Sequence, residues 1–448
     1  MPRLTLAEPE AQAHLAGFMA GAAGAPVRIL EARPLQGGAI QENWLVTAEI
    51  GGAAAALVLR TDAPTGLAVS HGRAQEFAIL RAAHGAGVLV PEPLWLCRDP
   101  AVLGRVFYLM RRIAGVAQGY RVVKDKSLGG DRAKLAERLG VELARIHSIR
   151  PGERGLEFLS LPQGSPALAA ITGLRAHLDR SERGHPVLEW GLRRLELSAP
   201  AAGEIVLTHQ DFRTGNYMLD ATGLTGILDW EFAAWGDPMT DIGWFCARCW
   251  RFGAEDLEAG GIASRADFYR GYEHTSGRRI DPPAVHFWEA MAHIRWAVIA
   301  LQQASRHIAG GERSLELALT GRLVPELELS TLALLAPGPW PSPAPLPAAV
   351  AAEPTGEMLL AEARRVMLEE FLPLLPADRH YEARMTANAM AIAARELAVL
   401  QPDQPDEKPL ALAIREGRHD GDPELRDRLA AQVLAKLAVS NPKAMPRS

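Results

Sequence analysis

The stretch that most constrains this 448-residue chain is a motif of polar residues set directly after a short β-prone run. The motif reads His-x-Asp-x-x-x-x-Asn, from His209 through Asp211 to Asn216, and it follows the apolar run Ile205-Val206-Leu207. A short run of β-branched and apolar residues is typical of a buried strand. The pattern therefore predicts that Asp211 lies in a loop that begins where a buried strand ends.

The residues after Asn216 predict a β-hairpin. Two short apolar runs, 217–219 and 224–228, are separated by Asp220-Ala221-Thr222-Gly223, whose residue types favour a turn. Asn216 stands at the start of this hairpin, and Asp229 follows its end. Folding the hairpin brings these two side chains together, and their amide and carboxylate oxygens are ligands that Mg²⁺ prefers.

Together, the aspartates and the asparagine match what phosphoryl transfer from ATP requires. One carboxylate must lie beside the attacking hydroxyl group, and oxygen ligands must hold magnesium against the phosphates. We predict Asp211 as the catalytic base, His209 and Arg213 as further catalytic residues, and Asn216 and Asp229 as the metal ligands. The motif alone could also be loop chemistry, because Asp and Asn are common in turns. The hairpin and the second aspartate at its far end favour the catalytic interpretation.

A second group of residues, nearer the N-terminus, predicts a nucleotide-binding half. Gly37 and Gly38 lie between two predicted strands, where backbone N–H groups can approach phosphate oxygens without a side chain in the way. Arg60 ends the next strand, where a kinase has its phosphate-binding lysine, and Glu76 lies on the following helix as its partner. Met110 ends a further strand, where a hinge would offer backbone groups to adenine. The alternatives are an ordinary turn at Gly37 and Gly38, a surface arginine at position 60 and a solvated glutamate at position 76.

Composition is typical of an intracellular enzyme. The chain has 48 Lys and Arg against 53 Asp and Glu, a net charge of −5, so no general positive field favours nucleic acid. Only 3 cysteines occur, which excludes a disulfide framework. We see neither a signal peptide nor an apolar run long enough to span a membrane. We therefore expect a cytoplasmic protein without nucleic-acid or membrane partners.

The order of the predicted elements indicates an α+β fold in several parts. Residues 1–112 alternate strands with helices, and helices dominate residues 113–336 apart from the central hairpins. Prolines recur at every second position between 337 and 347, so residues 337–350 can form neither a helix nor an inner strand and predict an extended linker. Residues 351–448 return to helical periodicity and predict a small helical bundle.

With these motifs, residues 25–335 resemble the aminoglycoside phosphotransferase/choline kinase superfamily, which has the protein-kinase-like fold. The resemblance implies a bilobal structure with an antiparallel-sheet N-lobe and a mainly helical C-lobe, with ATP and Mg²⁺ as cofactors. Gly236-Asp237-Pro238 and Asp241 resemble the Gly-Asp-Pro-x-x-Asp signature of the family, and we expect these carboxylates to brace the active-site loops. The loop from Gly37 to Trp44 departs from the commoner Gly-Gly-Ala-Ser-Asn form.

Within the superfamily, Val58-Leu59-Arg60, Ala83-His84 and the strand 107–110 resemble the branch linked to acyl-CoA dehydrogenases, which has arginine in place of the strand lysine. That resemblance implies phosphorylation of a hydroxyl group on a 4-hydroxyacyl-CoA type of substrate, a CoA thioester, with an acyl-CoA dehydrogenase as a pathway partner. Arg384–Asn388 and Ala394–Leu397 resemble a small helical domain of unassigned function, which we expect to dock on the kinase.

Two groups of basic residues could meet the phosphates of such a substrate, although core positions and a solvated surface are the alternatives for them. The first group lies in one stretch and the second along a helix predicted at 283–309: Arg111, Arg112, Arg121, Lys124 and Lys126, then His286, His293, Arg295, Arg306 and His307 together with Trp296.

Two other functions stay open from the sequence. An aminoglycoside or small-alcohol kinase would share the motifs, but polycationic aminoglycosides call for an acidic pocket, and residues 250–336 are nearly balanced in charge. A catalytically decayed nucleotide-binding scaffold would explain the arginine at position 60. The intact Asp211, Asn216 and Asp229 argue against decay.

Overall fold

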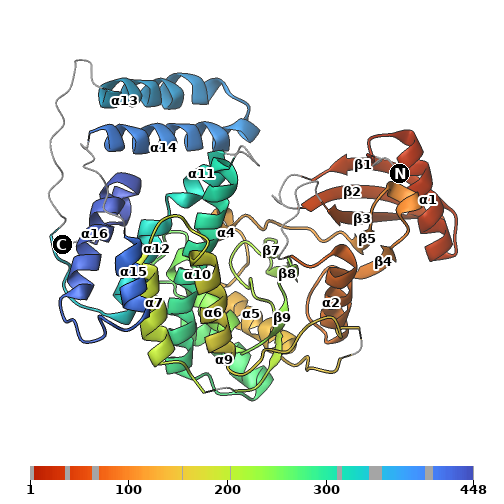
Figure 1. The fold of residues 1–448 in the computed structure, drawn as a ribbon. Coiled ribbons are helices and arrows are strands. Elements are labelled where there is room, and N and C mark those ends of the chain that lie inside the picture. Colours follow the sequence, from red (N-terminus) through yellow and green to blue (C-terminus); the bar gives the residue numbers. More distant parts are fainter. Residues whose placement is uncertain are drawn as a thin grey trace. The chain divides into compact units, whose positions relative to one another are not determined.

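The structure is a computed structural model that describes residues 5–35, 41–62, 70–153, 155–201, 203–309, 315–342, 356–398 and 407–446. Figure 1 shows its helices and strands, coloured along the sequence. The chain divides into two compact units. The first comprises Met1–Pro166 and Ala202–Val285, and the second comprises Ala167–Ala201 and His286–Ser448. Each unit therefore combines segments that are far apart in the sequence. These units do not coincide with the domain boundaries expected from the sequence, which stay a prediction.

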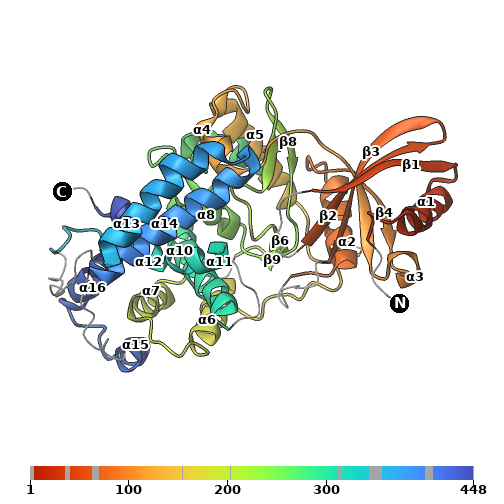
Figure 2. The same cartoon turned by 90° about the horizontal axis from the view of Figure 1, so that it is seen from above.

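The first unit begins with a five-stranded antiparallel sheet in the order β1-β2-β3-β5-β4. Gly51 and Gly52 make the turn between β2 and β3 with φ angles of 56° and 86°, which glycine adopts without a steric penalty. One face of the sheet packs against α1 around a cluster that includes Leu15, Val46 and Phe107 (Figure 2). The elements of this lobe are α1 (Pro9–Ala23), β1 (Val27–Pro34), β2 (Gln41–Ile50), β3 (Ala53–Asp62), α2 (Arg73–Gly85), β4 (Pro93–Cys97), α3 (Pro100–Leu103) and β5 (Phe107–Arg111).

Strand β4 was not predicted from the sequence. It begins with Pro93, which has no N–H to give to a neighbouring strand, so its sequence argues against an inner position. In the structure β4 is the last strand in the order and pairs only with β5 among the described strands, and a proline is tolerated at such an edge.

The rest of the first unit holds helices and two short antiparallel strand pairs, β6 with β9 and β7 with β8. Tyr217 lies opposite Ile227 in the second pair, so the predicted hairpin is confirmed. The elements are α4 (Gly119–Lys124), α5 (Arg132–Ile146), β6 (Val206–Thr208), β7 (Tyr217–Leu219), β8 (Leu224–Ile227), β9 (Ala234–Gly236), α8 (Met239–Cys246), a 3₁₀ turn (Arg248–Trp250) and α9 (Arg265–Ser276).

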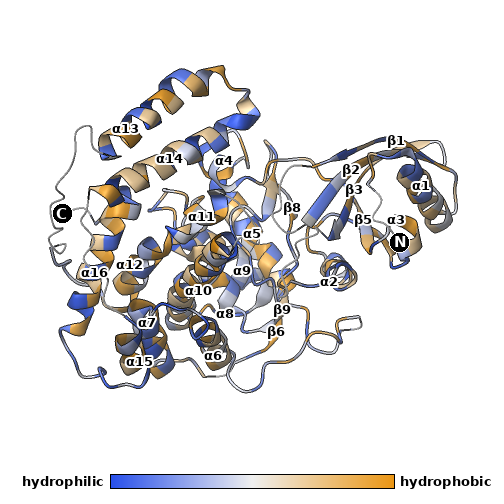
Figure 3. Cartoon of the chain, turned by 45° about the horizontal axis from the view of Figure 1, so that its top comes forward, coloured by the Kyte–Doolittle hydropathy of each residue, from blue (hydrophilic) through white to orange (hydrophobic). Residues whose placement is uncertain are grey.

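The second unit is helical in the part that the structure describes. Apolar residues, orange in Figure 3, run along α12 and α16 and belong to a core that also includes residues of α7 and α15. Its helices are α6 (Pro166–Leu178), α7 (Pro186–Leu197), α10 (Pro282–Ile308), α11 (Leu315–Gly321), α12 (Val324–Leu335), α13 (Gly356–Val366), α14 (His380–Leu397), α15 (Lys408–Arg415) and α16 (Leu425–Ser440). Most of the predicted proline-rich linker, from residue 343 onward, lies outside the described residues.

The predicted α+β class is confirmed, with an antiparallel sheet first, mainly helical structure next and further helices at the C-terminal end. None of the described helices combines the length and the apolar character that crossing a bilayer requires.

Candidate active site

The loop that carries Asp211 follows β6, as the sequence predicts. Gln210 in this loop has a φ of 65°, in the left-handed region that a non-glycine residue adopts at a cost. The carboxylate of Asp241, fully buried at the start of α8, accepts hydrogen bonds from the backbone N–H groups of His209 (2.7 Å) and Gln210 (2.8 Å). Asp241 therefore holds the loop in this conformation, in the bracing role expected for it.

A buried pair supports Asp241 in turn. Burial alone would raise the pKa of this carboxyl, but the hydrogen bond from His147 (3.1 Å) and the nearby charge outweigh it, so its pKa is lowered. His147 also contacts the hydroxyl of Tyr272 at 2.9 Å. Burial lowers the pKa of His147. The ionised form of Asp241 is thus favoured, and that form accepts the two backbone hydrogen bonds.

His209 is fully buried. Its Nε2 donates to the backbone carbonyl of Leu228 at 2.9 Å, and its Nδ1 accepts from the N–H of Asp211 at 3.3 Å. The ring lies against Trp230, with centroids 4.7 Å apart. We predicted a catalytic His209, but a ring enclosed in this way favours a positioning role, in which it ties the Asp211 loop to the end of the hairpin.

Three side chains donate hydrogen bonds to the carboxylate of Asp211. Its Oδ1 accepts from Nε1 of Trp244 (2.9 Å) and from Nε of Arg213 (3.0 Å), and its Oδ2 accepts from Nδ2 of Asn216. A carboxylate oxygen has two lone-pair directions, so among the described residues the second direction on Oδ2 remains for an attacking hydroxyl group. Asp211 is 8% exposed, so a small part of its surface stays reachable from solvent.

Sequence reasoning missed Trp244. It lies three residues after Asp241 on α8, almost one helical turn, so the helix that braces the loop through its first turn also presents the indole to Asp211. The spacing from Asp241 was the available signal. Arg213, which we predicted, lies over the ring of Trp250 at 4.5 Å, so its guanidinium is held between an aromatic face and the carboxylate of Asp211.

The hairpin places Asn216 beside Asp229. The N–H of Leu228, next to Asp229, donates to the backbone carbonyl of Asn216 at 2.8 Å. The side-chain nitrogen of Asn216 faces the carbonyl (2.9 Å) and the carboxylate of Asp211, so its oxygen points elsewhere. Within the described residues, Oδ2 of Asp229 makes no hydrogen bond, and its side chain stays 32% exposed. The hairpin thus brings together two oxygen donors, the amide oxygen of Asn216 and Oδ2 of Asp229, and oxygen ligands of this kind fit Mg²⁺.

Asp229 itself has a φ of 69°, a second left-handed non-glycine residue in the motif. Burial alone would raise the pKa of Asp229, but the attraction of Arg60 outweighs it and lowers that pKa. Asp229 is therefore ionised at neutral pH, as a metal ligand must be.

The predicted pair of Arg60 and Glu76 is present. Nη2 of Arg60 lies 3.0 Å from Oε1 of Glu76 and 2.8 Å from Oδ1 of Asp229. Glu76 is also bound by Arg73, a buried residue that sequence reasoning missed although it stands three positions earlier on α2. Arg73 donates further to Asp62 (2.8 Å) and to the carbonyl of His71 (2.9 Å). Two guanidinium groups therefore share one buried carboxylate.

Tyr108 is a neutral neighbour of the Glu76 carboxylate. Burial and the nearby Glu76 raise the pKa of Tyr108 well above its usual value. Arg60 also retains a donor. Its Nε is buried and has no hydrogen-bond partner in the described part of the chain. A phosphate oxygen would satisfy that group, because a guanidinium fork binds phosphate through two donors. The residues at this site therefore fit a nucleotide phosphate as well as a cation.

Other predicted contacts are placed less directly. Gly37 and Gly38 lie outside the described residues. Met110 pairs with Val58 and Pro93 inside the sheet, and the next two N–H groups donate to the carbonyls of Glu92 and Ala56. Its contact with adenine stays a prediction.

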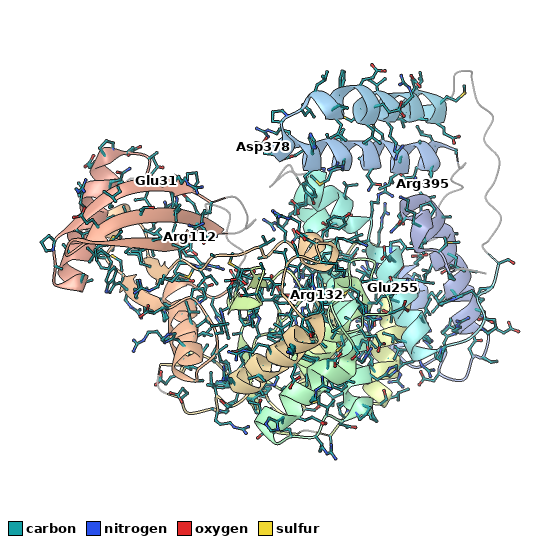
Figure 4. All side chains as sticks on the ribbon, turned by 180° about the vertical axis from the view of Figure 1, so that it is seen from behind. Glu31, Arg112, Arg132, Glu255, Asp378 and Arg395 are labelled. Atoms are coloured by element: carbon teal, nitrogen blue, oxygen red, sulfur yellow. The ribbon has the colours of Figure 1, made fainter. Side chains whose placement is uncertain are left out.

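The two groups of basic residues also differ. In the second unit His293 is fully buried on α10 and contacts the carbonyl of Glu289 at 2.8 Å, which favours a core role over ligand binding. In the first unit Arg111 pairs with Glu92 (2.7 Å). All five side chains of the first basic group are exposed: Arg111, Arg112 (labelled in Figure 4), Arg121, Lys124 and Lys126.

Similarity to known proteins agrees with this geometry. The sequence profile described as the phosphotransferase enzyme family (APH) matches residues 31–282, and a domain of unknown function (DUF6285) matches residues 373–444. A solved structure from Ralstonia eutropha, of a protein assigned to the aminoglycoside phosphotransferases, has a TM-score of 0.57 and 22% identity; the match covers 72% of this chain and 97% of that one. At this identity the match shows the fold, so the predicted kinase-like architecture is confirmed.

Two curated relatives are acyl-CoA dehydrogenase family member 10 from Mus musculus and acyl-CoA dehydrogenase family member 11 from Pongo abelii. They are 27% and 26% identical to this chain over 290 and 296 residues, which is 60% and 62% of its length. The matched regions span only 26% and 37% of these relatives. The resemblance to the branch linked to acyl-CoA dehydrogenases is thereby confirmed. Since the family profile covers more than half of the 448 residues, the chain belongs to the phosphotransferase enzyme family.

Proposed function

We propose that this phosphotransferase uses ATP and Mg²⁺ to phosphorylate a hydroxyl group on an acyl chain carried by coenzyme A. One observation carries the first half of this proposal. Arg60 from the sheet, Asp229 from the end of the hairpin and Asp211 from the loop after β6 belong to one connected set of contacts, through Asn216 and the hairpin backbone. Phosphoryl transfer needs this combination of a phosphate-binding cation, metal ligands and a base.

In the proposed reaction the acceptor oxygen forms a bond to the γ-phosphorus, the bond from that phosphorus to the β–γ bridging oxygen breaks, and ADP leaves. The proton of the hydroxyl group passes to Oδ2 of Asp211, whose Oδ1 is occupied by Trp244 and Arg213. Asn216 fixes the orientation of that carboxylate. Mg²⁺, bound through Asn216 and Asp229, would neutralise charge on the phosphate oxygens.

The intact cluster argues against a decayed scaffold. Asp211, Asn216 and Asp229 each have an ordered environment, and two left-handed residues, Gln210 and Asp229, are retained in it. Each such residue costs on the order of 1–3 kcal/mol, and the surrounding structure must stabilise it. A protein that had lost catalysis would have no need for that strain beside its base and its metal ligand.

The acyl-CoA part of the proposal rests on the two relatives named as acyl-CoA dehydrogenase family members and on the exposed basic stretch that includes Arg121, Lys124 and Lys126. Exposed cations attract the CoA phosphates over about 10 Å at 0.1 M salt. An acyl-CoA dehydrogenase is then the enzyme class that we propose as a pathway partner, because phosphorylation turns a hydroxyl group into a leaving group.

The test is a comparison of ADP formation with four acceptors: a 4-hydroxyacyl-CoA, the matching free 4-hydroxy acid, an amino alcohol and an aminoglycoside. We expect kcat/KM for the CoA thioester to exceed that for the free acid by at least about tenfold, roughly 1.4 kcal/mol. Equal values for these two acceptors would reject the recognition of CoA. A preference for the amino alcohol or the aminoglycoside would replace the substrate while leaving the reaction intact.

A charge variant sharpens the same test. Neutralising Arg121, Lys124 and Lys126 together should raise KM for the CoA thioester with little change in kcat, and added salt should raise KM of the unaltered protein. The matched control neutralises three other exposed basic residues of the first unit, namely Arg81, Arg98 and Lys134. An equal rise in KM for both triple variants would show that the position of the charges does not matter.

A further inference from the structure

Two helices that match the domain of unknown function, α15 and α16, share a hydrophobic core with α7 and α12 of the second unit. Helix α7 lies within the residues that the phosphotransferase profile matches. Four buried residues come from α7 and α12, and seven come from α15 and α16. The members are Val187, Trp190, Leu329 and Leu332, then Ile414, Leu425, Leu429, Ala430, Val433, Leu434 and Leu437. These side chains form one cluster, so neither set has a complete apolar core without the other.

Charged groups also pair across this seam, the contact between α7 and α12 on one side and α15 and α16 on the other. Glu189 on α7 is 2% exposed, and Arg415 on α15 binds it through two nitrogens, with Nε at 3.1 Å from Oε2. Arg415 also contacts Asp179 at 2.6 Å. Among the described residues, Arg175 is a second cation near Glu189, with its Nε 3.5 Å from Oε2. Removing the closest partner of a buried carboxylate strongly destabilises the fold, because the charge is left buried and uncompensated. Glu189 therefore depends on an arginine that the C-terminal part of the chain supplies.

A polar rim surrounds this centre. Arg193 binds Asp420 (2.6 Å), Asn441 donates to Glu326 (2.8 Å), and Arg322 binds Glu396 through two nitrogens (2.6 and 2.8 Å). On the accessory side, Arg395 of α14, labelled in Figure 4, donates to the carbonyls of Val439 and Ser440 at the end of α16. A buried apolar centre inside a hydrogen-bonded rim is the anatomy of a stable protein–protein interface.

The backbones also approach closely at one point. A Cβ atom added to Gly184, just before α7, would lie 2.3 Å from the backbone nitrogen of Lys408 and 2.3 Å from the backbone carbon of Glu407. Backbone atoms cannot move aside as the end of a side chain can. Glycine at this position therefore permits the contact between the start of α15 and the segment before α7.

We propose that the domain of unknown function acts as a core-completing partner of the phosphotransferase, through a seam between α7–α12 and α15–α16 that holds without the covalent link. The proposal does not rest on the identity of the substrate. It assigns a role to the C-terminal helices, namely to cover the apolar face of α7 and α12 and to neutralise Glu189. It also specifies the kind of partner that this face accepts: a pair of amphipathic helices that carries an arginine opposite the buried acid.

The experiment uses the full chain and cleaves it after folding. A specific protease site is inserted within residues 343–355, and the cut protein is passed over a size-exclusion column at low micromolar concentration. We expect the two pieces to elute together and to separate only in denaturant. Separation of the pieces under native conditions would overturn the proposal.

Variants then locate the contact. Arg415→Ala should weaken the association of the cut pieces by at least about tenfold, because it leaves Glu189 buried with a more distant cation. The matched control is Arg418→Ala, whose side chain is 63% exposed and pairs with Glu416 on its own segment. Equal association constants for the two variants would also overturn the proposal. Gly184→Ala supplies a test without a charge change, and we expect it to weaken association too. Far-UV circular dichroism of the uncut variants shows whether each one is folded before it is cleaved.

Discussion

Nη2 of Arg60 donates a hydrogen bond to Oδ1 of Asp229 at 2.8 Å, across 169 residues of sequence. The same nitrogen lies 3.0 Å from Glu76, so one guanidinium joins the sheet, the α2 helix and the end of the hairpin. The nucleotide half and the metal half of the predicted site therefore meet through a charged contact.

Asp211→Asn should reduce turnover by about 10²–10⁴-fold, because the amide cannot accept the proton of the hydroxyl group. The affinity for Mg-ATP should change little, since Asp229 and Arg60 are untouched. Single-turnover kinetics and calorimetric titration with Mg-ATP measure the two quantities. Retention of more than about a tenth of the unaltered rate would contradict the role of Asp211 as base.

Asp229→Ala should act in the opposite way on binding. It removes a metal ligand and also frees Arg60, so the affinity for Mg-ATP should fall by at least about tenfold. The matched control is Asp220→Ala in the turn of the same hairpin, whose carboxylate accepts hydrogen bonds from Thr222 and Gly223 and lies away from Asn216. An unchanged affinity in the Asp229 variant would remove that residue from the metal site.

Arg73→Met should raise KM for ATP more than it lowers kcat. Without Arg73, Glu76 keeps only Arg60 among its guanidinium partners in the described chain, and the orientation of Arg60 toward a phosphate is lost. Arg73→Lys should raise KM for ATP less than Arg73→Met does, because lysine keeps the positive charge but lacks the two-pronged guanidinium group. If both variants lose thermal stability and neither changes KM, Arg73 is a structural residue only.

Trp244→Phe tests the donor that the sequence did not reveal. The substitution keeps an aromatic ring and removes the N–H that contacts Asp211 at 2.9 Å. We expect kcat to fall by about tenfold while KM for ATP stays constant, since the indole contacts the base and not the nucleotide residues. The comparison variant is Trp250→Phe, which retains an aromatic ring beneath Arg213. Equal kcat values for Trp244→Phe and the unaltered enzyme would remove Trp244 from the mechanism.

Glu328, which is buried, and His185, which is half-buried, predict opposing effects of pH on the stability of the second unit. Burial, only partly offset by Lys436, raises the pKa of Glu328 from 4.5 to about 7, and burial lowers the pKa of His185 from 6.5 to about 4. Between about pH 4.5 and 7 the folded form keeps the proton on Glu328 and the unfolded form does not, so stability falls as pH rises. His185 gives the opposite slope between about pH 4 and 6.5.

Glu328→Gln should separate the two effects. The substitution removes the pH-dependent contribution of Glu328 to the free energy of unfolding, on the order of 3 kcal/mol. The free energy of unfolding of the variant should therefore rise between pH 4.5 and 6.5, whereas that of the unaltered protein should change little there. Urea unfolding at several pH values measures the free energy of unfolding. The control is Glu326→Gln, two residues earlier on α12, where Glu326 accepts a hydrogen bond from Asn441. The same pH dependence in the Glu328 variant and the unaltered protein would contradict the assignment.

The sequence by itself determined the local parts of this protein. The loop with Asp211 and the hairpin from Asn216 to Asp229 could be predicted, because alternating apolar runs and turn residues act over short distances. The partnership of Arg60 with Glu76 followed from the order of strands and helices, together with the motif downstream. These features depend on residues that are near one another in the chain. The periodicity of apolar residues and the residue types in turns therefore predict them.

Only the tertiary structure decided which distant groups meet. The indole of Trp244 on Asp211, the second guanidinium of Arg73 on Glu76 and the enclosure of His209 depend on how helices and strands pack, and no local pattern records that packing. The same holds for the seam that joins Glu189 to Arg415 across 226 residues. A buried charge at position 189 looks like any helix-surface acid in the sequence, and its partner is set by the fold, because burial arises from residues that are far away along the chain.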